Sequence, residues 1–272
     1  MSTPIDIAFI GGGNMATAII GGLLRQGRSP ASILVIDPVI EQRQRLTETL
    51  GVQTAEGPEA ALREAQTVVW AVKPQQFKEA AQTYASLTDQ ALHYSVMAGL
   101  RTDDMARLLG TPRIVRAMPN TPALVGQGMT GLYAREEVSA DERSAVESMV
   151  ETTGQFLWVN QEADLDAVTA LSGSGPAYVF YFIEGMMQAA QDMGLSAEQG
   201  RQLALATFGG ATTLAAQSTD SPAVLRERVT SKGGTTYAAL TTLESAGVKA
   251  AFISAMRAAQ QSAQELGDEF GR

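Results

Sequence analysis

The sequence predicts an α/β protein in which a Rossmann-type, doubly wound domain is followed by an all-helical domain. Over residues 1–160, short runs of β-branched and other apolar residues alternate with helical segments, the pattern of βαβ units that build a parallel sheet. Beyond residue 160, Ala, Leu, Met and Gln recur at helical spacing, and no segment alternates convincingly with a period of two. We therefore expect one domain over residues 1–160 and a second over residues 161–272, with no Pro/Ser-rich linker between them.

The individual elements follow from the same two patterns. In the first domain, compact apolar runs predict strands over residues 5–10, 33–36, 67–72, 92–97 and 113–117, with edge strands over 128–133 and 155–159. In the second domain, helical spacing bounded by Gly or Ser predicts helices over residues 168–194, 196–217, 237–245 and 247–267. Residues 171–176 interrupt the first of these helices with Ser, Gly and Pro. Close packing, a ligand or a simple turn between helices would each explain that interruption.

Composition narrows the classes of function. The 272 residues are 45% hydrophobic and 18% charged, as in a globular protein of one large or two modest domains. The net charge is −9 and the basic residues are scattered, so we expect no nucleic-acid partner. The apolar run at residues 178–183 is far shorter than the roughly 20 residues of a spanning helix, so we expect no membrane partner. The start of the chain has no basic segment and Asp6 interrupts its apolar run, so we expect no targeting segment.

Catalytic side chains are scarce in this chain. Cys is absent, which excludes disulfides and fits a cytoplasmic protein, and we expect no metal site. His93 is the only histidine, and its place inside a strand pattern indicates a packed residue more than a catalyst. Chemistry must therefore rest on backbone N–H groups, hydroxyls, a few carboxylates and amines, and a cofactor.

A glycine-rich turn directly after the first strand predicts the site of that cofactor. Residues 11–16 follow the G-x-G-x-x-G/A pattern between a strand and a helix, which is the fingerprint of dinucleotide binding. Gly11 allows the tight turn, Gly13 lets the backbone approach a pyrophosphate, and Ala16 permits close packing of helix on strand. The N–H groups of the helix start, at Asn14 and Met15, would then face the anion.

The acid at the end of the second strand leaves the choice of dinucleotide open. Asp37 lies where an acidic residue normally takes the ribose hydroxyls of NAD and repels the extra phosphate of NADP. Arg43 and Arg45 follow it, and they fit either a cationic clamp for that phosphate or a solvated helix face.

Two further strand ends contribute expected cofactor contacts. Ala71, Val72, Lys73 and Pro74 follow the 67–72 run, and proline turns the chain across the carboxyl edge of the sheet, where ligands bind in open α/β folds. Lys73 would reach a ribose or phosphate, although a solvated loop lysine explains it as well. The small residues at 98 and 99 would let a nicotinamide lie close; they are Ala98 and Gly99.

The substrate side is expected in three polar segments. Asn120, between two prolines after the 113–117 strand, offers both a donor and an acceptor at the sheet edge. Ser172 lies in the interruption of the first helix of the second domain. Residues 231–236 join three hydroxyl residues and two adjacent glycines before a helix, which a simple cap would not require. Consecutive N–H groups at a helix start are suited to a substrate carboxylate.

These motifs together resemble those of the Δ1-pyrroline-5-carboxylate reductase family over essentially the whole length of the chain. The resemblance is carried by residues 11–16, 71–74, 116–122, 171–178 and 222–244. The last stretch is similar to the family signature and is highly specific. Two residues depart from the family pattern: Lys232 stands where proline is usual, and Asp37 differs from a site selected purely for NADPH.

The resemblance implies an oxidoreductase that reduces a small cyclic imine, Δ1-pyrroline-5-carboxylate, to L-proline in the last step of proline biosynthesis. It implies hydride transfer from NADPH, with NADH as a compatible donor. It also implies homodimers built through the helical domain, which would bind substrate too, and further assembly of dimers into decamers.

The same resemblance implies roles for the 231–236 turn. The catalytic residue would be Thr236, whose hydroxyl would hydrogen-bond the ring nitrogen and orient it, because a threonine hydroxyl is a poor independent acid. An imine that enters already protonated would explain why no histidine is needed. The substrate carboxylate would lie on the backbone N–H groups of the turn, and the residues expected to bind it are Ser231, Gly233, Gly234 and Thr235.

Two other functions stay open on the residues alone. A β-hydroxyacid dehydrogenase shares the plan of the two domains but needs a base, typically a lysine on a helix of the second domain. Lys249 is the only lysine there besides Lys232, which weakens that alternative. A non-catalytic nucleotide-binding protein would keep the glycine-rich turn, and the intact residues 231–236 argue against it.

Overall fold

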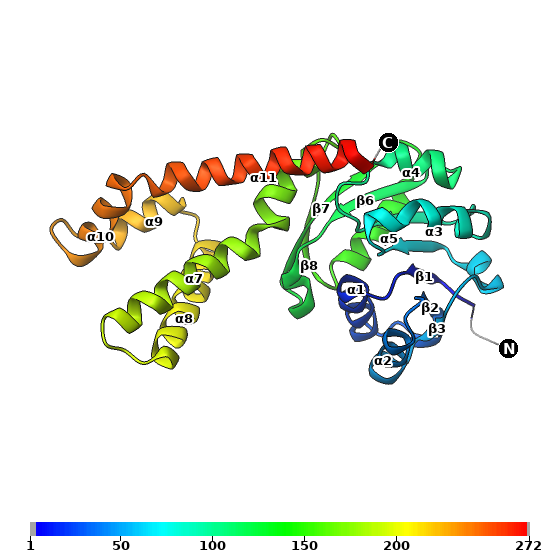
Figure 1. The fold of residues 1–272 in the computed structure, drawn as a ribbon, viewed down its shortest axis with the longest axis horizontal. Helices are drawn as coiled ribbons and strands as arrows, with labels where there is room; N and C mark the ends of the chain where they lie inside the picture. Colours follow the sequence, from blue (N-terminus) through cyan, green and yellow to red (C-terminus); the bar gives the residue numbers. More distant parts are fainter. Residues whose placement is uncertain (1–3, 271–272) are drawn as a thin grey trace. The chain divides into compact units, whose positions relative to one another are not determined.

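The computed structural model describes residues 4–270, which form two compact units (Figure 1). The first unit comprises the chain up to Ser174 together with the part from Ala259 onward, and the second comprises Gly175–Ala258. The boundary between the units therefore lies after residue 174, and the last part of the chain, from Ala259, belongs to the first unit again. The assignment of separate functions to residues 1–160 and 161–272 stays a prediction.

An eight-stranded sheet forms the centre of the first unit, in the order β3-β2-β1-β4-β5-β6-β7-β8. Its strands are β1 Ile7–Ile10, β2 Ile33–Ile36, β3 Gln53–Ala55, β4 Thr67–Trp70, β5 Leu92–Ser95, β6 Ile114–Met118, β7 Gly128–Ala134 and β8 Gly154–Trp158. All neighbours run parallel except β6 and β7. The predicted Rossmann-type fold class is confirmed. The strand order reverses between β1 and β4, where open α/β sheets bind ligands at the carboxyl ends of their strands.

Helices cover both faces of this sheet. They are α1 Asn14–Arg25, α2 Ile40–Leu50, α3 Phe77–Tyr84, α4 Thr102–Leu109, α5 Ala140–Val150 and α6 Asp164–Val168. Helices α1, α2 and α5 supply Ile20, Leu46 and Met149 to one core cluster, whereas α3 and α4 supply Phe77 and Met105 to the other. Short 3-10 turns join these elements at η1 Pro30–Ser32, η2 Ala60–Glu64, η3 Pro74–Gln76, η4 Ala85–Leu87 and η5 Thr121–Val125.

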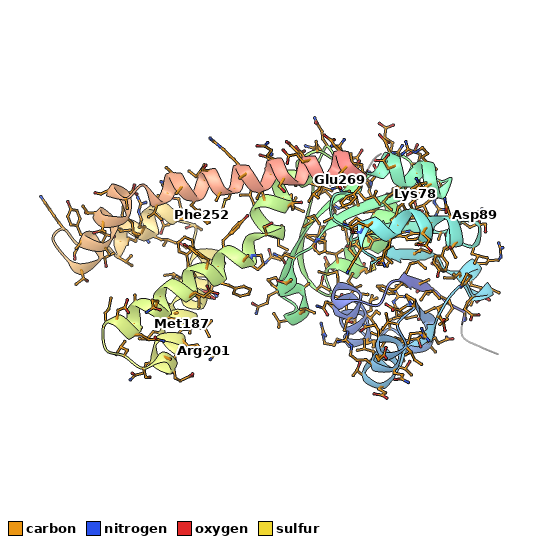
Figure 2. The ribbon with its side chains drawn as sticks, in the orientation of Figure 1. Lys78, Asp89, Met187, Arg201, Phe252 and Glu269 are labelled. Carbon is orange, nitrogen blue, oxygen red and sulfur yellow. The ribbon has the colours of Figure 1, made fainter. Side chains whose placement is uncertain are left out.

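The second part of the chain is all-helical, as predicted. Its helices are α7 Gly175–Asp192, α8 Ala197–Gln217, α9 Pro222–Arg228, α10 Thr235–Ser245 and α11 Val248–Phe270. The expected interruption at residues 171–176 is confirmed, because a π-helical turn, η6 Thr169–Gly173, precedes α7. Within the second unit, Phe252 of α11 (labelled in Figure 2) anchors an aromatic cluster. Its ring packs edge-on against those of Tyr178 and Phe182 of α7, with centroids 5.8 and 5.6 Å away. Across residues 4–270, every helix is too short or too polar to cross a membrane.

Candidate active site

Gly11 holds together the carboxyl ends of three strands. Its N–H donates to the carbonyl of Ile36 at 2.8 Å, and its φ of +98° lies in the region that favours glycine. A Cβ at Gly11 would lie 2.6 Å from the carbonyl oxygen of Ala71, which is backbone and has no flexible end to move. Glycine is therefore required here by both the turn and the close approach of the 71–74 loop.

Gly13 opens helix α1 toward a ligand. It is the N-cap residue of α1 and provides no side chain to cap the helix. The N–H groups of Asn14, Met15 and Ala16 have no partner within the helix, since the first amides of an α-helix lie before its hydrogen-bond ladder. A Cβ at Gly13 would meet no atom within 4 Å, so the turn is open on this side. This arrangement fits the pyrophosphate of a dinucleotide.

Asp37 fastens the glycine-rich turn to the second strand. The side-chain oxygens of this nearly buried residue, 9% exposed, accept from the N–H groups of Gly12 at 2.8 Å and Val39 at 2.9 Å. Gln42 donates from its side chain to the Gly12 carbonyl and secures the turn from the other side. Asp37 therefore has a structural reason to be acidic that is independent of any ribose.

The two arginines beyond Asp37 differ in their surroundings. Arg43 donates to the Asp37 carbonyl at 2.7 Å and lies 3.4 Å from the Glu56 carboxylate. These contacts hold its side chain against the turn after β2. Arg45 lies exposed on α2, which matches the solvated-face interpretation. Arg43 is therefore already paired within the protein, and Arg45 is exposed to solvent.

A cavity of about 320 Å³ lies at the carboxyl ends of β1, β2 and β4. It brings together two predicted cofactor residues, Gly11 and Val72, and Lys73 is exposed beside it. Residues of this cavity that sequence reasoning missed include Pro38, Glu56 and Gln76. Glu56 was missed because it follows β3, a three-residue strand without an apolar run.

The loop after β5 is already covered on one side. Gly99 has a φ of +78°, and a Cβ there would lie 3.0 Å from the Phe270 ring and 3.4 Å from Leu266 Cβ, both on α11. Packing of α11 thus explains this glycine without a ligand. Ala98 remains exposed at the same edge of the sheet, and it keeps the predicted cofactor contact as a proposal.

Asn120 and Ser172, both predicted to bind substrate, are hydrogen-bonded to each other. The Asn120 side-chain amide donates to the carbonyl and the hydroxyl of Ser172, at 3.2 and 3.1 Å. Its Oδ1 accepts from the N–H of Met129 at 2.9 Å. The structure therefore brings these two residues together and engages most of their polar groups.

The 231–236 segment forms one compact turn in the second unit. Gly233 has a φ of +76°, and the Gly234 N–H donates to the Ser231 carbonyl at 3.0 Å. The positive φ of Gly233 gives it a conformational reason to be glycine, whereas a Cβ at Gly234 would meet Ser231 Oγ, a side-chain end that can rotate. Helix α10 begins at Thr235, with Thr236 as its second residue, earlier than the predicted 237.

This turn presents donors to a ligand at the start of α10. Because the Gly234 N–H closes the turn, the amides left for a carboxylate are those of the first helical residues, including Thr235 and Thr236. Lys232 is exposed in the turn.

His93 is buried, as expected, and is unsuited to acid–base catalysis. The Trp70 indole donates to His93 Nδ1 at 2.9 Å, and His93 Nε2 lies 3.1 Å from the Thr88 carbonyl, which requires a proton on Nε2. Burial lowers the pKa of His93 to about 4, the Thr88 hydrogen bond opposes that change, and the Arg113 charge adds to it. The ring is therefore neutral near pH 7 and acts in packing.

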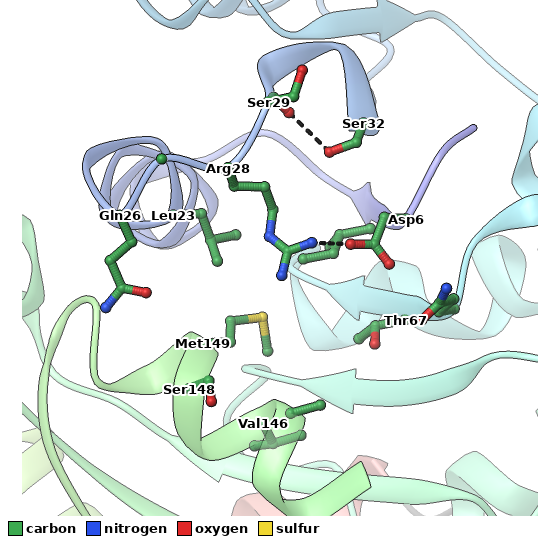
Figure 3. Close-up of a pocket in the computed structure, with 14 residues that line it drawn as sticks. Asp6, Leu23, Gln26, Arg28, Ser29, Ser32, Thr67, Val146, Ser148 and Met149 are labelled. Carbon is green, nitrogen blue, oxygen red and sulfur yellow. Dashed lines mark hydrogen bonds and ion pairs between the residues drawn. The ribbon is translucent and has the colours of Figure 1, made fainter. Parts of the chain in front are cut away.

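A larger cavity, of about 590 Å³, lies at the opposite, amino end of the sheet (Figure 3). Arg28 and Asp6 point toward one another across it as an ion pair, above an apolar floor that includes Leu23 and Met149. None of the predicted site residues lines it. Its volume alone is therefore no argument for catalysis.

Comparison with known proteins defines first a class and then a family. Residues 6–99, which include the glycine-rich turn, match the family model of coenzyme F420-dependent NADP oxidoreductases, so this part of the chain is similar to an oxidoreductase. Residues 162–266 match the model of the pyrroline-5-carboxylate reductase dimerisation domain. The chain belongs to the pyrroline-5-carboxylate reductase family.

Relatives and solved structures match nearly the whole length of the chain. It is 43% identical to the pyrroline-5-carboxylate reductase of Pseudomonas aeruginosa, over 100% of both chains. The solved reductase of Coxiella burnetii is 38% identical with a TM-score of 0.90, covering 97% of this chain and 99% of that one. The Plasmodium falciparum enzyme, solved with NADP bound, is 27% identical with a TM-score of 0.87, covering 98% and 99%.

Family membership confirms the predicted enzyme class, an NAD(P)H-dependent oxidoreductase that reduces pyrroline-5-carboxylate in the last step of proline biosynthesis. Among the functions that the residues alone left open, the comparisons support the reductase. The match to a dimerisation domain also makes the protein a homo-oligomer.

Proposed function

We propose that the first unit binds the dinucleotide at its glycine-rich turn and the second binds the substrate carboxylate at the start of α10. The observation that carries the proposal is the 231–236 turn, where two adjacent glycines shape the backbone immediately before Thr235 and Thr236. Amides at a helix N-terminus favour an anion through both their free N–H groups and the helix dipole. The dinucleotide site then belongs to residues 1–160, and dimerisation and substrate binding belong to residues 161–272.

The proposed cofactor residues are those at the carboxyl ends of the strands. The amides of Asn14 and Met15 would hold the pyrophosphate, with Gly11 and Gly13 giving it access. The 71–74 loop and Ala98 would contact the remainder of the dinucleotide, which supplies a hydride when bound.

NADPH is the proposed hydride donor, with NADH accepted. The relative from Plasmodium falciparum holds NADP. Asp37 argues less strongly for NAD than its position suggests, because both carboxylate oxygens already accept backbone N–H groups. The ratio of kcat/KM for the two nucleotides, in the native chain and in Asp37→Ser, measures this preference.

The proposed chemistry of the second unit is orientation of a protonated imine. The amides of Thr235 and Thr236 would receive the substrate carboxylate, with Ser231 and Gly233 shaping the turn beneath it. The Thr236 hydroxyl would accept a hydrogen bond from the protonated ring nitrogen and orient the imine, and the nitrogen would keep its proton when the ring carbon receives the hydride. A threonine hydroxyl is too weak an acid to donate that proton independently. This division of roles needs no histidine, in agreement with the buried neutral His93.

Replacing the hydroxyl of Thr236 tests this role. Thr236→Ala is expected to lower kcat/KM for the imine on the order of 10- to 100-fold, because a hydrogen bond to the reacting nitrogen is lost. Thr236→Ser keeps the hydroxyl and is expected to retain most of the activity. Steady-state kinetics of the two variants, with circular dichroism to show that both fold, make the measurement. Native kinetics in Thr236→Ala would remove this residue from the mechanism.

Assembly and location complete the proposal. We propose homodimers formed through the helical domain and gathered into decamers, in the cytoplasm. Large exposed apolar side chains of the second unit support burial against another copy, among them Phe180, Tyr181 and Leu203. The mass in solution, by light scattering, tests the number of copies.

A further inference from the structure

A polar network joins three segments of the first unit that are distant in sequence. Asn120 follows β6, Met129 lies in β7, and Ser172 lies in the π-helical turn η6. The contacts of the network are the two hydrogen bonds from the Asn120 amide to Ser172, the Met129 N–H to Asn120 Oδ1, and a long contact of 3.5 Å from Ser172 Oγ to the Met129 carbonyl. All of these are at least partly buried.

The chemistry of these partners determines which way the Asn120 amide faces. Because the Met129 N–H can only donate, the atom opposite it must be the amide oxygen. The amide nitrogen then faces Ser172, whose carbonyl and hydroxyl oxygens both lie within hydrogen-bond distance of it. The side-chain amide of Asn120 is thereby engaged within the protein through both its oxygen and its nitrogen.

The turn that Asn120 holds is unusual and lies at a critical place in the chain. The Ser174 N–H donates to the Thr169 carbonyl at 2.8 Å, which is the wide i to i+5 bond of a π-helix. Such turns are rare and are frequent at functional sites. At Ser174 the chain also leaves the first unit, and α7 begins at the next residue.

The flanks of η6 are packed closely on the sheet, so its position depends on β6 and β7. A Cβ on Gly173 would meet Met118 Cε, the movable end of a side chain at the end of β6, so the turn lies directly against that strand. A Cβ on Gly131 of β7 would lie 2.7 Å from Val168, immediately before the turn. The Asn120 network is the polar part of the same attachment.

We propose that Asn120 is a positioning residue for the reaction and not a substrate ligand. Its amide pins η6 to the carboxyl end of β6 and to β7, and thereby fixes the point from which the helical second unit departs. Ser172 acts as its partner in this role. The kinetic part of this inference rests on the proposed function, whereas the structural part does not.

Asn120→Asp separates the two halves of the network. The new carboxylate still accepts from the Met129 N–H, but it has no donor for Ser172 and places a charge against the Ser172 carbonyl. Hydrogen exchange of residues 169–174, measured without ligands, is expected to accelerate about tenfold or more, while the Met129 amide stays protected. Asn160→Asp, the same charge change at an exposed residue outside the network, is the matched control and should leave that exchange unchanged.

Kinetics then distinguish positioning from contact. For Asn120→Asp, kcat is expected to fall about tenfold with less than about a threefold change in KM for the imine. Ser172→Ala, a milder change, is expected to accelerate exchange in the same segment to a smaller extent. The double variant Asn120→Ala/Ser172→Ala should lower kcat little more than the more damaging of its two single variants, because the effects of coupled residues are not additive.

Native exchange in both Asn120→Asp and Ser172→Ala would overturn the inference. So would a rise of more than about tenfold in KM with unchanged exchange, because that pattern belongs to a residue touching the substrate. The exchange measurement needs no turnover, so failure of the proposed reaction would leave its outcome readable.

Discussion

Gly11→Ala is expected to weaken dinucleotide binding severely. The added Cβ would lie 2.6 Å from the Ala71 carbonyl oxygen and 2.8 Å from its carbon, and the φ of +98° is unfavourable for any residue with a Cβ. Because backbone must move at β4 or in the turn itself, the α1 amides and the 71–74 loop would lose their relation to each other. We expect KM for NADPH to rise at least about tenfold, a loss of roughly 1.4 kcal/mol in binding.

Gly27→Ala provides the matched control. Gly27 also has a positive φ, of +89°, but a Cβ there would meet no atom within 4 Å. The Gly27→Ala variant therefore has the strain of a positive φ but no steric clash. Its KM for NADPH should stay near the native value. A Gly11→Ala protein with native KM for both nucleotides would show that the turn does not shape the cofactor site.

Removing the carboxylate of Glu162 is expected to cost the largest amount of stability. Glu162 Oε1 accepts from the Thr102 N–H at 2.8 Å and from Arg116 at 2.9 Å, while Oε2 accepts from the Thr102 hydroxyl at 2.6 Å. The carboxylate thus caps the start of α4 and neutralises Arg116, a β6 residue that is 4% exposed. Glu162→Ala removes the hydrogen-bonded partner of that buried charge and leaves the Coulombic attraction of Asp166. Removing one partner of a buried pair typically costs about 3 kcal/mol or more.

An exposed ion pair of similar length gives the comparison. Arg101 Nη2 and Asp268 Oδ1 lie 2.6 Å apart, and the two side chains are 44% and 61% exposed. Because solvent screens such pairs, Asp268→Ala should lower the free energy of unfolding by less than about 1 kcal/mol. Glu162→Gln, which keeps an acceptor but no charge, should fall between the two. Urea unfolding of the first unit, followed by tryptophan fluorescence, compares all three; equal losses in Glu162→Ala and Asp268→Ala would contradict the buried-charge explanation.

Local patterns carried most of what the sequence could predict. The glycine-rich turn could be predicted because its features are local: it follows strand β1 directly and leads into helix α1 within residues 11–16. Most strands could be predicted because parallel strands that are buried on both faces appear in the sequence as continuous apolar runs. β3 was missed for the opposite reason, since its residues Gln53–Ala55 have no such run.

Long-range partners could not be predicted in the same way. The sequence does not reveal that Asn120 and Ser172, 52 positions apart, hydrogen-bond to each other. It also does not reveal that the Asp37 carboxylate accepts two backbone N–H groups. The binding roles expected for these residues stay predictions. The packing of Leu266 and Phe270 on Gly99 is another contact that only the folded chain displays.

Supplying purified protein with Δ1-pyrroline-5-carboxylate and either NADPH or NADH tests the central claim most directly. We predict oxidation of the nucleotide with formation of an equal amount of L-proline, and no comparable turnover of a panel of β-hydroxyacids with the oxidised nucleotides. Absence of imine reduction with both nucleotides, in protein shown to be folded, would contradict the assigned reaction.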